Sequence, residues 1–345
     1  MEQQLTKLWY RDDAGPSLLR PLSWLYGAAV RVRRSAYAQG WLPAHRVGRP
    51  VVVVGNLTVG GTGKTPLVIW LAQHLTRQGF KVGIVSRGYG TPGGQEPRLV
   101  TGQSTWREVG DEPLLLSRRT GCATMVARDR VAGARALVAE RVDVIVADDG
   151  LQHLRLARDC EIVVVDGTRG FGNAQVLPAG PLREPVSRLA QADLIVVNGA
   201  AEHPSLRRLG ASVQARALQM TLLTGDAVSL DGHESSRPLE DFRGRPLHAI
   251  AGIGNPARFF RDLRARGLDV IEHPFPDHHP FEPRDLAFKD DFPVLMTEKD
   301  AVKCIGFANP RSWVVPATAA FDEPQARELL EHVLRKIGSP TSPGG

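Results

Sequence analysis

Short apolar runs alternate with longer helical patterns between residues 51 and 200. The pattern predicts helices over 65–78 and 128–142, and strands over 51–56, 81–86, 123–127, 143–148, 161–166 and 193–198. Strands that are apolar throughout are typical of a sheet buried on both faces. Their alternation with helices favours an α/β domain with a mostly parallel sheet covered by helices. We assign residues 46–212 to this domain.

The hydrophobic pattern changes after residue 212. Residues 213–240 lack a helical period and are predicted to form a β-linker, in which Gly225-Asp226 is a candidate hairpin turn. A second, smaller α/β domain is predicted over 241–337. Its expected strands are 247–253, 268–273, 293–300 and 312–317, and its expected helices are 256–266 and 323–337. Residues 338–345 are expected to be a disordered tail.

Residues 1–45 carry an amphipathic helical pattern. Pro21 suits the first turn of a helix, and a stripe at helical spacing follows it: Leu22, Leu25, Ala29, Val32 and Ala36. Arg31 and Arg34 fall on the opposite side, and Arg33 flanks the stripe. Such arginines, together with the tryptophans and tyrosines of this segment, favour binding to an anionic membrane surface. The alternative is a helix that packs on its own domain, with its arginines solvated.

The first predicted strand runs into the glycine-rich sequence GNLTVGGTGKTP at residues 55–66, and a helix follows. This strand–loop–helix context is typical of a P-loop, in which backbone N–H groups and the helix N-terminus bind phosphate. Lys64 can reach the β- and γ-phosphates of ATP. A strict P-loop has glycine where Thr58 stands. The candidate ATP-binding residues are Thr58, Val59, Gly60, Gly61, Thr62, Gly63, Lys64 and Thr65. The alternative is a glycine-rich turn with a chance GKT.

A second acidic element supports the P-loop interpretation. The apolar run 143–148 ends in Asp148, and Asp149 follows directly. P-loop enzymes bind Mg²⁺ through the hydroxyl after the P-loop lysine, here Thr65, and an acid at a strand end. Asp148 stands where that acid belongs, and Asp149 can bind the metal or orient a group beside it. The alternative is a solvated DDG turn.

Composition narrows the function classes. The three cysteines, Cys122, Cys160 and Cys304, are scattered, which argues against a disulfide framework or a zinc site and fits a reducing cytosol. The formal net charge of +6 suits an anionic partner such as nucleic acid, acidic lipid or a phosphorylated substrate. No apolar run reaches the ~18 residues that span a bilayer, and the N-terminus is too polar for a secretory signal. We therefore expect a cytoplasmic protein that spans no membrane.

Seven motifs follow one another in a specific order. They are GNLTVGGTGKTP (55–66), SRGYG (86–90), GDEP (110–113), ARDR (127–130), DDGLQH (148–153), LPAGPLREP (177–185) and FPDHHPF (275–281). In these motifs the chain resembles the tetraacyldisaccharide 4′-kinase family of the lipid A pathway in Gram-negative bacteria, from the N-terminal helix to TEKD (297–300). One departure is Leu151, where the family usually has an aromatic residue.

The resemblance implies a reaction and a location. ATP would donate its γ-phosphoryl group to the 4′-hydroxyl of a tetraacylated glucosamine disaccharide 1-phosphate, giving the bis-phosphorylated lipid A precursor. The implied cofactors are ATP and Mg²⁺. Because this lipid lies in the inner membrane, the protein is expected to be peripheral on its cytoplasmic face. The expected partners are the membrane-embedded lipid and an anionic membrane surface, with neither nucleic acid nor an obligate protein partner.

The resemblance also implies roles for individual residues. Asp111 in GDEP would be the catalytic base, and His278 in FPDHH would assist it, although by sequence alone Asp111 and Glu112 could equally be helix-capping acids. Since His278 lies in the second domain, the site would form between domains and require their closure. Further candidates for substrate or phosphate contacts, beside strand ends or glycine-containing loops, are Arg87, Glu112, Arg128, His153 and Arg183.

Two other sequence features carry less weight. His273, Asp277, His278 and His279 are not taken as a metal cluster, since no spaced partner group completes a site. Gly252-Ile253-Gly254 is taken as a turn, because the full dinucleotide-binding pattern is missing. The runner-up function is a membrane-associated P-loop ATPase of the partitioning or metal-insertion type, and a nucleotide-binding regulator on nucleic acid is a third. Neither explains GDEP, LREP and FPDHH.

Overall fold

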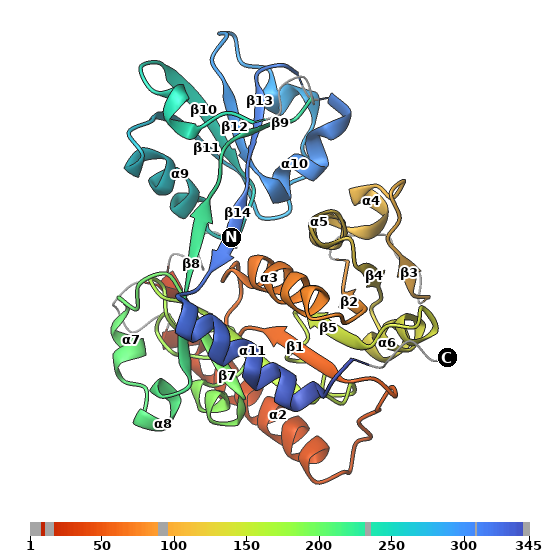
Figure 1. Ribbon diagram of the computed structural model, residues 1–345. Coiled ribbons are helices and arrows are strands. Elements are labelled where there is room, and N and C mark those ends of the chain that lie inside the picture. The colour runs from red at the N-terminus through yellow and green to blue at the C-terminus, as the bar shows by residue number, and fades with distance from the viewer. Residues whose placement is uncertain (1–7, 11–16, 89–95, 232–235, 308, 341–345) are drawn as a thin grey trace.

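The first domain of the computed structural model is built on a nine-stranded sheet (Figure 1). The structure describes residues 8–10, 17–88, 96–231, 236–307 and 309–340. The sheet has the order β14-β8-β7-β6-β1-β5-β2-β4-β3. Its strands are β1 (Val51–Gly55), β2 (Val82–Ser86), β3 (Arg98–Leu99), β4 (Ala123–Val126), β5 (Val144–Asp148), β6 (Cys160–Asp166), β7 (Leu194–Asn198), β8 (Ala217–Thr224) and β14 (Ala317–Ala320). The pairs from β8 to β4 are parallel, as the apolar runs predict.

Helices cover both faces of this sheet. Alternate residues of β1 point to opposite sides, so Val52 and Val54 join one core cluster and Val51 and Val53 join the other. The first cluster includes side chains of α3 (Lys64–Arg77) and α11 (Glu323–Ile337), and the second includes α6 (Arg130–Ala139) and the 3-10 helix η2 (Val186–Gln191). Shorter helices are α4 (Trp106–Val109), α5 (Asp111–Thr120), α7 (Pro204–Arg207) and α8 (Ala211–Gln214).

A five-stranded sheet forms the second domain, in the upper part of Figure 1. Its order is β11-β10-β12-β13-β9, and only β9 runs antiparallel to its neighbour. The strands are β9 (Val228–Ser229), β10 (Pro246–Ala251), β11 (Asp269–Pro274), β12 (Val294–Thr297) and β13 (Ser312–Val315). The helices are α9 (Pro256–Ala265) and α10 (Glu298–Cys304), and 3-10 turns lie at Leu239–Phe242, Pro283–Leu286 and Ile305–Phe307.

Three expectations about the second half of the chain are wrong in detail. The chain leaves the first domain through β8 and returns through β14, which pairs with β8 in the large sheet. The helix at 323–337 therefore packs on the first domain, with Leu329, Val333 and Ile337 in its core. Gly225-Asp226 does not turn a hairpin, since β8 and β9 belong to different sheets. The predicted strand 293–300 ends at Thr297, which caps α10 by accepting from the backbone N–H of Asp300.

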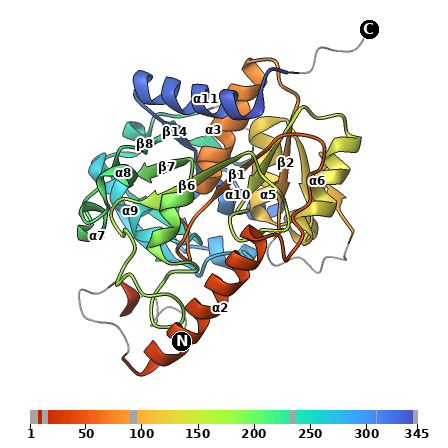
Figure 2. The same cartoon turned by 90° about the horizontal axis from the view of Figure 1, so that it is seen from below.

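The N-terminal helix α2 (Arg20–Ala38), preceded by the 3-10 turn η1 (Ser17–Leu19), lies across the first domain on the opposite side from α11 (Figure 2). Small residues make its closest packing: Ser23 donates to Leu19 O and accepts from Ala179 N–H, and Gly27 faces Val176. The apolar stripe points away from the domain. Leu22, Leu25 and Val32 are 53%, 69% and 67% exposed. No described helix is both long and apolar enough to cross a bilayer.

Candidate functional site

The P-loop lies between the carboxyl end of β1 and α3. Gly60 and Gly63 have φ angles of 93° and 92°, a backbone conformation that favours glycine. Asn198, at the end of β7, donates to Thr62 O at 2.9 Å. A Cβ at Gly63 would collide with that Asn198 side chain, so glycine is required there for two reasons. Val59 N–H donates to Pro181 O and Thr58 bridges to Leu182, so these two residues pair with a neighbouring loop.

Lys64, Asp149 and Arg183 form one charged cluster beside the P-loop. Lys64 Nζ lies 3.2 Å from Asn56 Oδ1 and 3.5 Å from Asp149 Oδ1. Arg183 Nη1 donates to the two Asp149 oxygens at 3.0 and 3.1 Å. Burial alone would raise the pKa of the Asp149 carboxyl, but the charges of Lys64 and Arg183 hold it well below its usual range. Asp149 has a φ of 48°, uncommon for a non-glycine residue and frequent at functional sites.

Asp148 ends β5 and is 1% exposed. Its Oδ2 accepts from Ser86 Oγ at 2.9 Å, whereas Oδ1 is buried without a hydrogen-bond partner in the described chain. Burial, then the charges of Glu112 and Asp149, raise the pKa of Asp148 to about 7. A buried carboxylate oxygen without a hydrogen-bond donor suits a hard cation, and Thr65 stands in the first turn of α3. These residues fit Mg²⁺, although the described residues hold no group of three His, Cys, Asp or Glu side chains able to bind a metal.

Asp111 and His278 come from different domains and meet at the interface. Asp111 is the first residue of α5, and it is 4% exposed. His278 Nδ1 lies 3.0 and 3.1 Å from its two carboxylate oxygens, and since a carboxylate only accepts, Nδ1–H is the donor. His278 has a φ of 61°. Val302 of α10 packs with Leu114 and Leu115 of α5 nearby, so the two domains are in contact around this pair.

Two lysines of α10 complete this cluster, and the sequence motifs predicted no role for either. Lys299 Nζ contacts Glu112 and Asp277, each at 3.0 Å, and lies 3.4 Å from His278 Nε2. Lys303 Nζ is 3.5 Å from Asp111 Oδ2. One turn of helix separates the two lysines, which places both on the face of α10 toward α5. The TEKD motif was a sequence signal for Lys299, whereas Lys303 lies outside it.

Burial and the neighbouring charges have opposing effects on the pKa values of Asp111 and His278. Burial alone would raise the pKa of Asp111, but the hydrogen bond from His278 and the charges of Lys299 and Lys303 hold it far below its ordinary value. Burial alone would lower the pKa of His278, and the bond to Asp111 outweighs it, so this pKa is raised. At neutral pH Asp111 is therefore a carboxylate that orients His278.

A basic group flanks the opposite side of Asp148. Arg130 is 2% exposed and donates to Ala127 O and Asp148 O. Burial, then the charges of Arg130 and Arg87, lower the pKa of His153 to about 4, so His153 is neutral at physiological pH.

Arg87 and Arg128, two of the predicted phosphate contacts, are exposed. The buried arginine of ARDR is Arg130, although Arg128 was the predicted candidate. Tyr89 and Gly90 of SRGYG lie outside the described residues.

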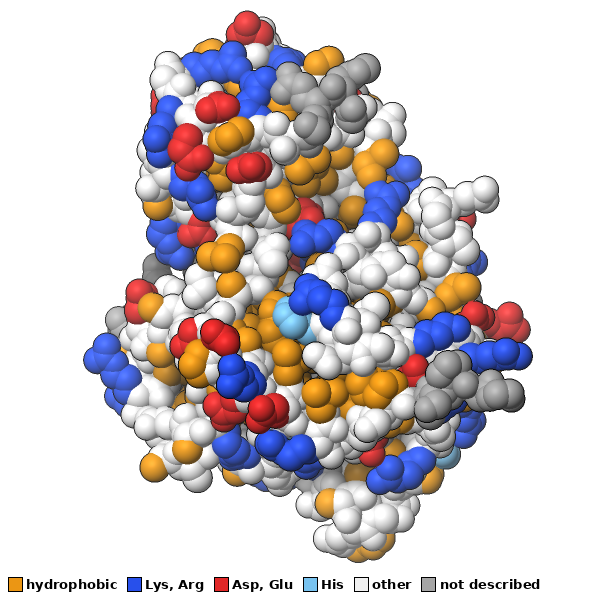
Figure 3. Space-filling model, viewed as in Figure 1, with side chains coloured by type: hydrophobic (Ala, Val, Ile, Leu, Met, Phe, Trp, Pro, Cys, Tyr) orange, Lys and Arg blue, Asp and Glu red, His pale blue; other side chains and the backbone are white. Residues whose placement is uncertain are grey.

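A turn of the second domain touches the P-loop directly. Arg169 donates to Gly61 O and to Gly254 O, and the second of these bonds is 3.1 Å long. A Cβ at Gly254 would lie 2.9 Å from Gly61 Cα and closer still to Gly61 N. The segment Gly252-Ile253-Gly254 is indeed a turn, and its last glycine permits this close approach. Acidic and basic side chains also meet where the two domains join (Figure 3).

Replacing Gly254 by alanine is expected to force this turn off the P-loop. We expect kcat/KM for ATP to fall by about 10-fold or more, because a displacement near 1 Å at a reaction site has effects of this size or larger. The matched control is Gly306→Ala, in the same domain, where a Cβ meets nothing within 4 Å. Steady-state kinetics of both variants is the measurement. Equal kcat/KM in the two variants would contradict the contact.

Comparison with known proteins agrees with this geometry. Residues 16–335 match the family model described as tetraacyldisaccharide-1-P 4′-kinase. The chain belongs to this family. It is similar to the tetraacyldisaccharide 4′-kinase of Alkalilimnicola ehrlichii, with 50% identity over 98% of this chain and 99% of the relative. The enzymes of Nitrosococcus oceani (48% identity, 96% of each chain) and Pseudomonas aeruginosa (45% identity, 97% and 99%) are also similar.

A crystal structure of LpxK from Aquifex aeolicus in complex with ATP is similar in fold. The TM-score is 0.77 at 28% identity, and the match covers 93% of this chain and 99% of that chain. The two-domain α/β architecture is therefore that of a tetraacyldisaccharide 4′-kinase, as the sequence motifs indicated. This match favours the kinase over the partitioning ATPase and the nucleic-acid regulator.

Proposed function

We propose that this chain transfers the γ-phosphoryl group of ATP to the 4′-hydroxyl of a tetraacyl disaccharide 1-phosphate. The observation that carries the proposal is the meeting of Asp111 and His278 across the domain interface, next to a P-loop whose Lys64 is already held by Asn56 and Asp149. We infer the acceptor from family membership, because the names of the family and its members specify the tetraacyl disaccharide and its 4′ position.

Each group has a proposed part in the transfer. Lys64 neutralises the β- and γ-phosphates, and the P-loop amides hold their oxygens. Arg183 keeps Asp149 fixed beside Lys64. As the acceptor oxygen bonds to phosphorus and the bond to the β-phosphate oxygen breaks, the Asp111 carboxylate accepts the hydroxyl proton, and His278 orients Asp111 through its Nδ1–H. Glu112 fixes Lys299, and we assign contacts with the phosphorylated substrate to His153, Arg87 and Arg128.

Thr65 and Asp148 would hold Mg²⁺, with Asp149 beside them. When bound, the ion supplies positive charge that neutralises the phosphate oxygens during transfer. The fit rests on the unpaired buried oxygen of Asp148.

Product analysis tests the proposed function. The full chain is incubated with ATP labelled in the γ-phosphate and the tetraacyl disaccharide 1-phosphate in mixed micelles, and the lipid product is isolated. We expect one labelled phosphate per lipid. An acceptor that lacks the 4′-hydroxyl is the control and should remain unlabelled. Release of labelled inorganic phosphate at the same rate with either lipid would instead favour the ATPase alternative.

We further propose that α2 lies in the inner membrane surface, on its cytoplasmic face. Its stripe of exposed aliphatic side chains has no partner on the domain among the described residues, and exposed apolar patches of this kind mark interaction sites. Arg33 flanks the stripe and can reach anionic headgroups. The substrate is an amphiphile, so an enzyme held at the interface reaches it without extracting it.

Replacing Leu22, Leu25 and Val32 by glutamine is expected to weaken binding to anionic vesicles by about 100-fold. Each residue is more than half exposed, so the substitutions should leave folding intact, while about 1 kcal/mol of insertion energy is lost per side chain. The control replaces three other exposed aliphatic residues, Leu223, Ile271 and Ile305, by glutamine. Co-sedimentation of both triple variants is the measurement, and equal binding would argue against insertion of α2.

A further inference from the structure

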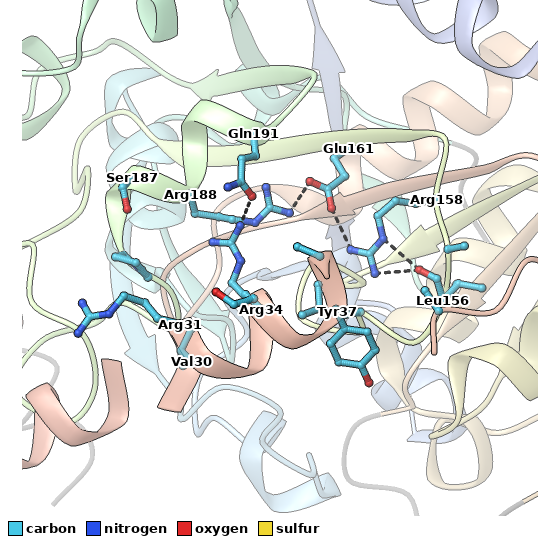
Figure 4. Close-up of a pocket in the computed structure, with 16 residues that line it drawn as sticks. Val30, Arg31, Arg34, Tyr37, Leu156, Arg158, Glu161, Ser187, Arg188 and Gln191 are labelled. Atoms are coloured by element: carbon cyan, nitrogen blue, oxygen red, sulfur yellow. Dashed lines mark hydrogen bonds and ion pairs between the residues drawn. The ribbon is translucent and has the colours of Figure 1, made fainter. Parts of the chain in front are cut away.

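A pocket of about 620 Å³ lies under the carboxyl-terminal half of α2 (Figure 4). The helix contributes Val30, Arg31 and Arg34, and the domain contributes Arg158, Glu161 and Arg188. Its volume falls within the range of small-ligand sites. No residue that we propose for phosphoryl transfer lines it. Glu161 is the second residue of β6, so the pocket lies toward the amino ends of the strands, whereas the P-loop and Asp148 lie at their carboxyl ends.

Positive charge predominates in this pocket. Arg158 pairs with Glu161 at 2.9 Å, and Arg188 pairs with the other oxygen of the same carboxylate. Arg34 pairs with Glu184 at 3.4 Å, behind the pocket wall. Arg31 stands exposed at the edge of the group. Three guanidinium groups therefore share two carboxylates, with Arg31 beside them, and a bound anion would neutralise the excess positive charge.

Two features show that this charge is incompletely paired. Arg188 is 3% exposed, and its Nη1 is buried without a hydrogen-bond partner in the described chain. A buried N–H group without an acceptor is destabilising, and a bound anion would supply one. Burial, followed by the charge of Arg188, lowers the pKa of Arg34, which indicates that the two guanidinium groups repel each other.

The position of the pocket indicates the source of the anion. Its wall is the inner side of α2, while the exposed stripe lies on the outer side of the same helix. A helix is only ~10 Å across. With the stripe inserted into the acyl boundary, Arg31 and the pocket mouth lie at the depth of the lipid phosphates. Arginine also binds phosphate oxygens in a fork geometry.

We propose that this pocket binds the phosphodiester headgroup of an anionic membrane phospholipid. Arg31 and Arg188 contact the phosphate, and the acyl chains pass beside α2 into the bilayer. The site is separate from that of the lipid substrate, and it holds the enzyme on the membrane between turnovers. It shares with the proposed function only the membrane-facing position of α2, because the inference requires no phosphoryl transfer.

Calorimetric titration of the full chain with dihexanoylphosphatidylglycerol, below its micelle concentration, tests the site. Two variants alter exposed positions and so should fold: Arg31→Gln removes a charge, and Ser187→Trp fills the pocket without changing charge. We expect Arg31→Gln to bind the lipid about 10-fold more weakly, the effect of one lost charge-assisted hydrogen bond, and Ser187→Trp to bind at least as weakly because its ring occupies the pocket. Arg327→Gln is the matched control, since Arg327 lies exposed on α11, on the opposite side of the first domain from α2, pairs with Glu323 and should bind normally.

Three outcomes would overturn the proposal. Equal affinity for dihexanoylphosphatidylcholine would remove the preference for an anion. Equal affinity for glycerol 3-phosphate would assign the site to a soluble phosphate rather than a lipid. Unchanged binding by Ser187→Trp would place the lipid elsewhere, including the substrate site. The titration is repeated in Lys64→Ala protein, where unaltered binding would support the site even if the kinase assignment failed.

Discussion

Replacing Lys64 by alanine is expected to lower kcat by about 1,000-fold or more. Lys64 is the one P-loop side chain placed to neutralise charge on the transferring phosphoryl group, and removal of such an electrostatic contact has effects of this size. The lysine is pre-positioned by Asn56 and Asp149, so the wild-type enzyme needs little rearrangement to use it. Binding of ATP should weaken less than catalysis, because the loop amides remain.

The loss of Lys64 also changes the electrostatic surroundings of Asp149. Without Lys64, Asp149 keeps its ion pair with Arg183 and loses the largest charge that lowers its pKa, so that pKa should rise toward the ordinary value. Lys81→Ala is the charge-matched control: Lys81 Nζ binds Glu140 O at the far end of β2, and its loss should leave kcat unchanged. Single-turnover kinetics with labelled ATP measures both variants. A folded Lys64→Ala protein that retains a tenth of wild-type kcat would contradict this role.

The first domain could be predicted from the sequence because its strands are buried on both faces. β1, β5, β6 and β7 are buried at every position, so each is an almost continuous apolar run, with Glu161 as the exception in β6, and each ends close to the site. Asp148 and the P-loop stand directly at such ends, and their proximity follows from parallel pairing of β1 with β5. In this domain the local hydrophobic pattern is therefore sufficient to place the site residues in the fold.

The domain boundaries could not be predicted in the same way. β14 pairs with β8 across roughly a hundred residues of intervening chain, and nothing local in 217–224 or 317–320 specifies that pairing. Since β14 returns the chain to the large sheet, α11 covers the first domain although it follows the second in sequence. An amphipathic pattern shows that a helix has a buried face but does not identify the surface it covers.

The same limit applies to α2 and to the catalytic cluster. The apolar stripe of α2 was recognised, yet only the structure shows that small residues, Ser23 and Gly27, make the packing contact and leave the stripe exposed. Lys299 and Lys303 were missed because their importance depends on α10 facing α5. The Thr297–Asp300 capping spacing was available as a helix-start signal and would have corrected the strand predicted there.

The titration of His278 provides an independent test of the interdomain pair. Because the bond to Asp111 raises the pKa of His278, Asp111→Asn is expected to lower it. The stabilisation from a raised histidine pKa is fully present below the ordinary value near 6.5 and is lost as pH rises through the raised folded value. Contact between the domains should therefore weaken on the alkaline side. Histidine NMR signals followed against pH measure the shift, and an unchanged pKa would mean that the pair is not formed in solution.

The Asp111–His278 pair is expected to act as one catalytic unit. Asp111→Asn should lower kcat by roughly 10²–10⁴-fold, the range for loss of a general base. Asparagine keeps the side-chain shape beside the buried Lys303, which limits damage to the fold. His278→Ala should also lower kcat with little effect on KM for ATP, because its contact is to Asp111 and not to the P-loop. The double variant should be little worse than the poorer single one, since groups that work together lose activity non-additively.

His279→Ala is the matched control for the histidine. His279 neighbours His278 but binds Asp285 at 3.0 Å, within its own domain, so kcat should stay close to wild type. The measurement is kcat for wild type, both single variants, the double variant and this control at saturating ATP and lipid. Multiplicative losses in the double variant would assign the two residues independent roles. A His278→Ala enzyme as active as His279→Ala would restrict His278 to holding the two domains together, and proton acceptance would then rest on Asp111 alone.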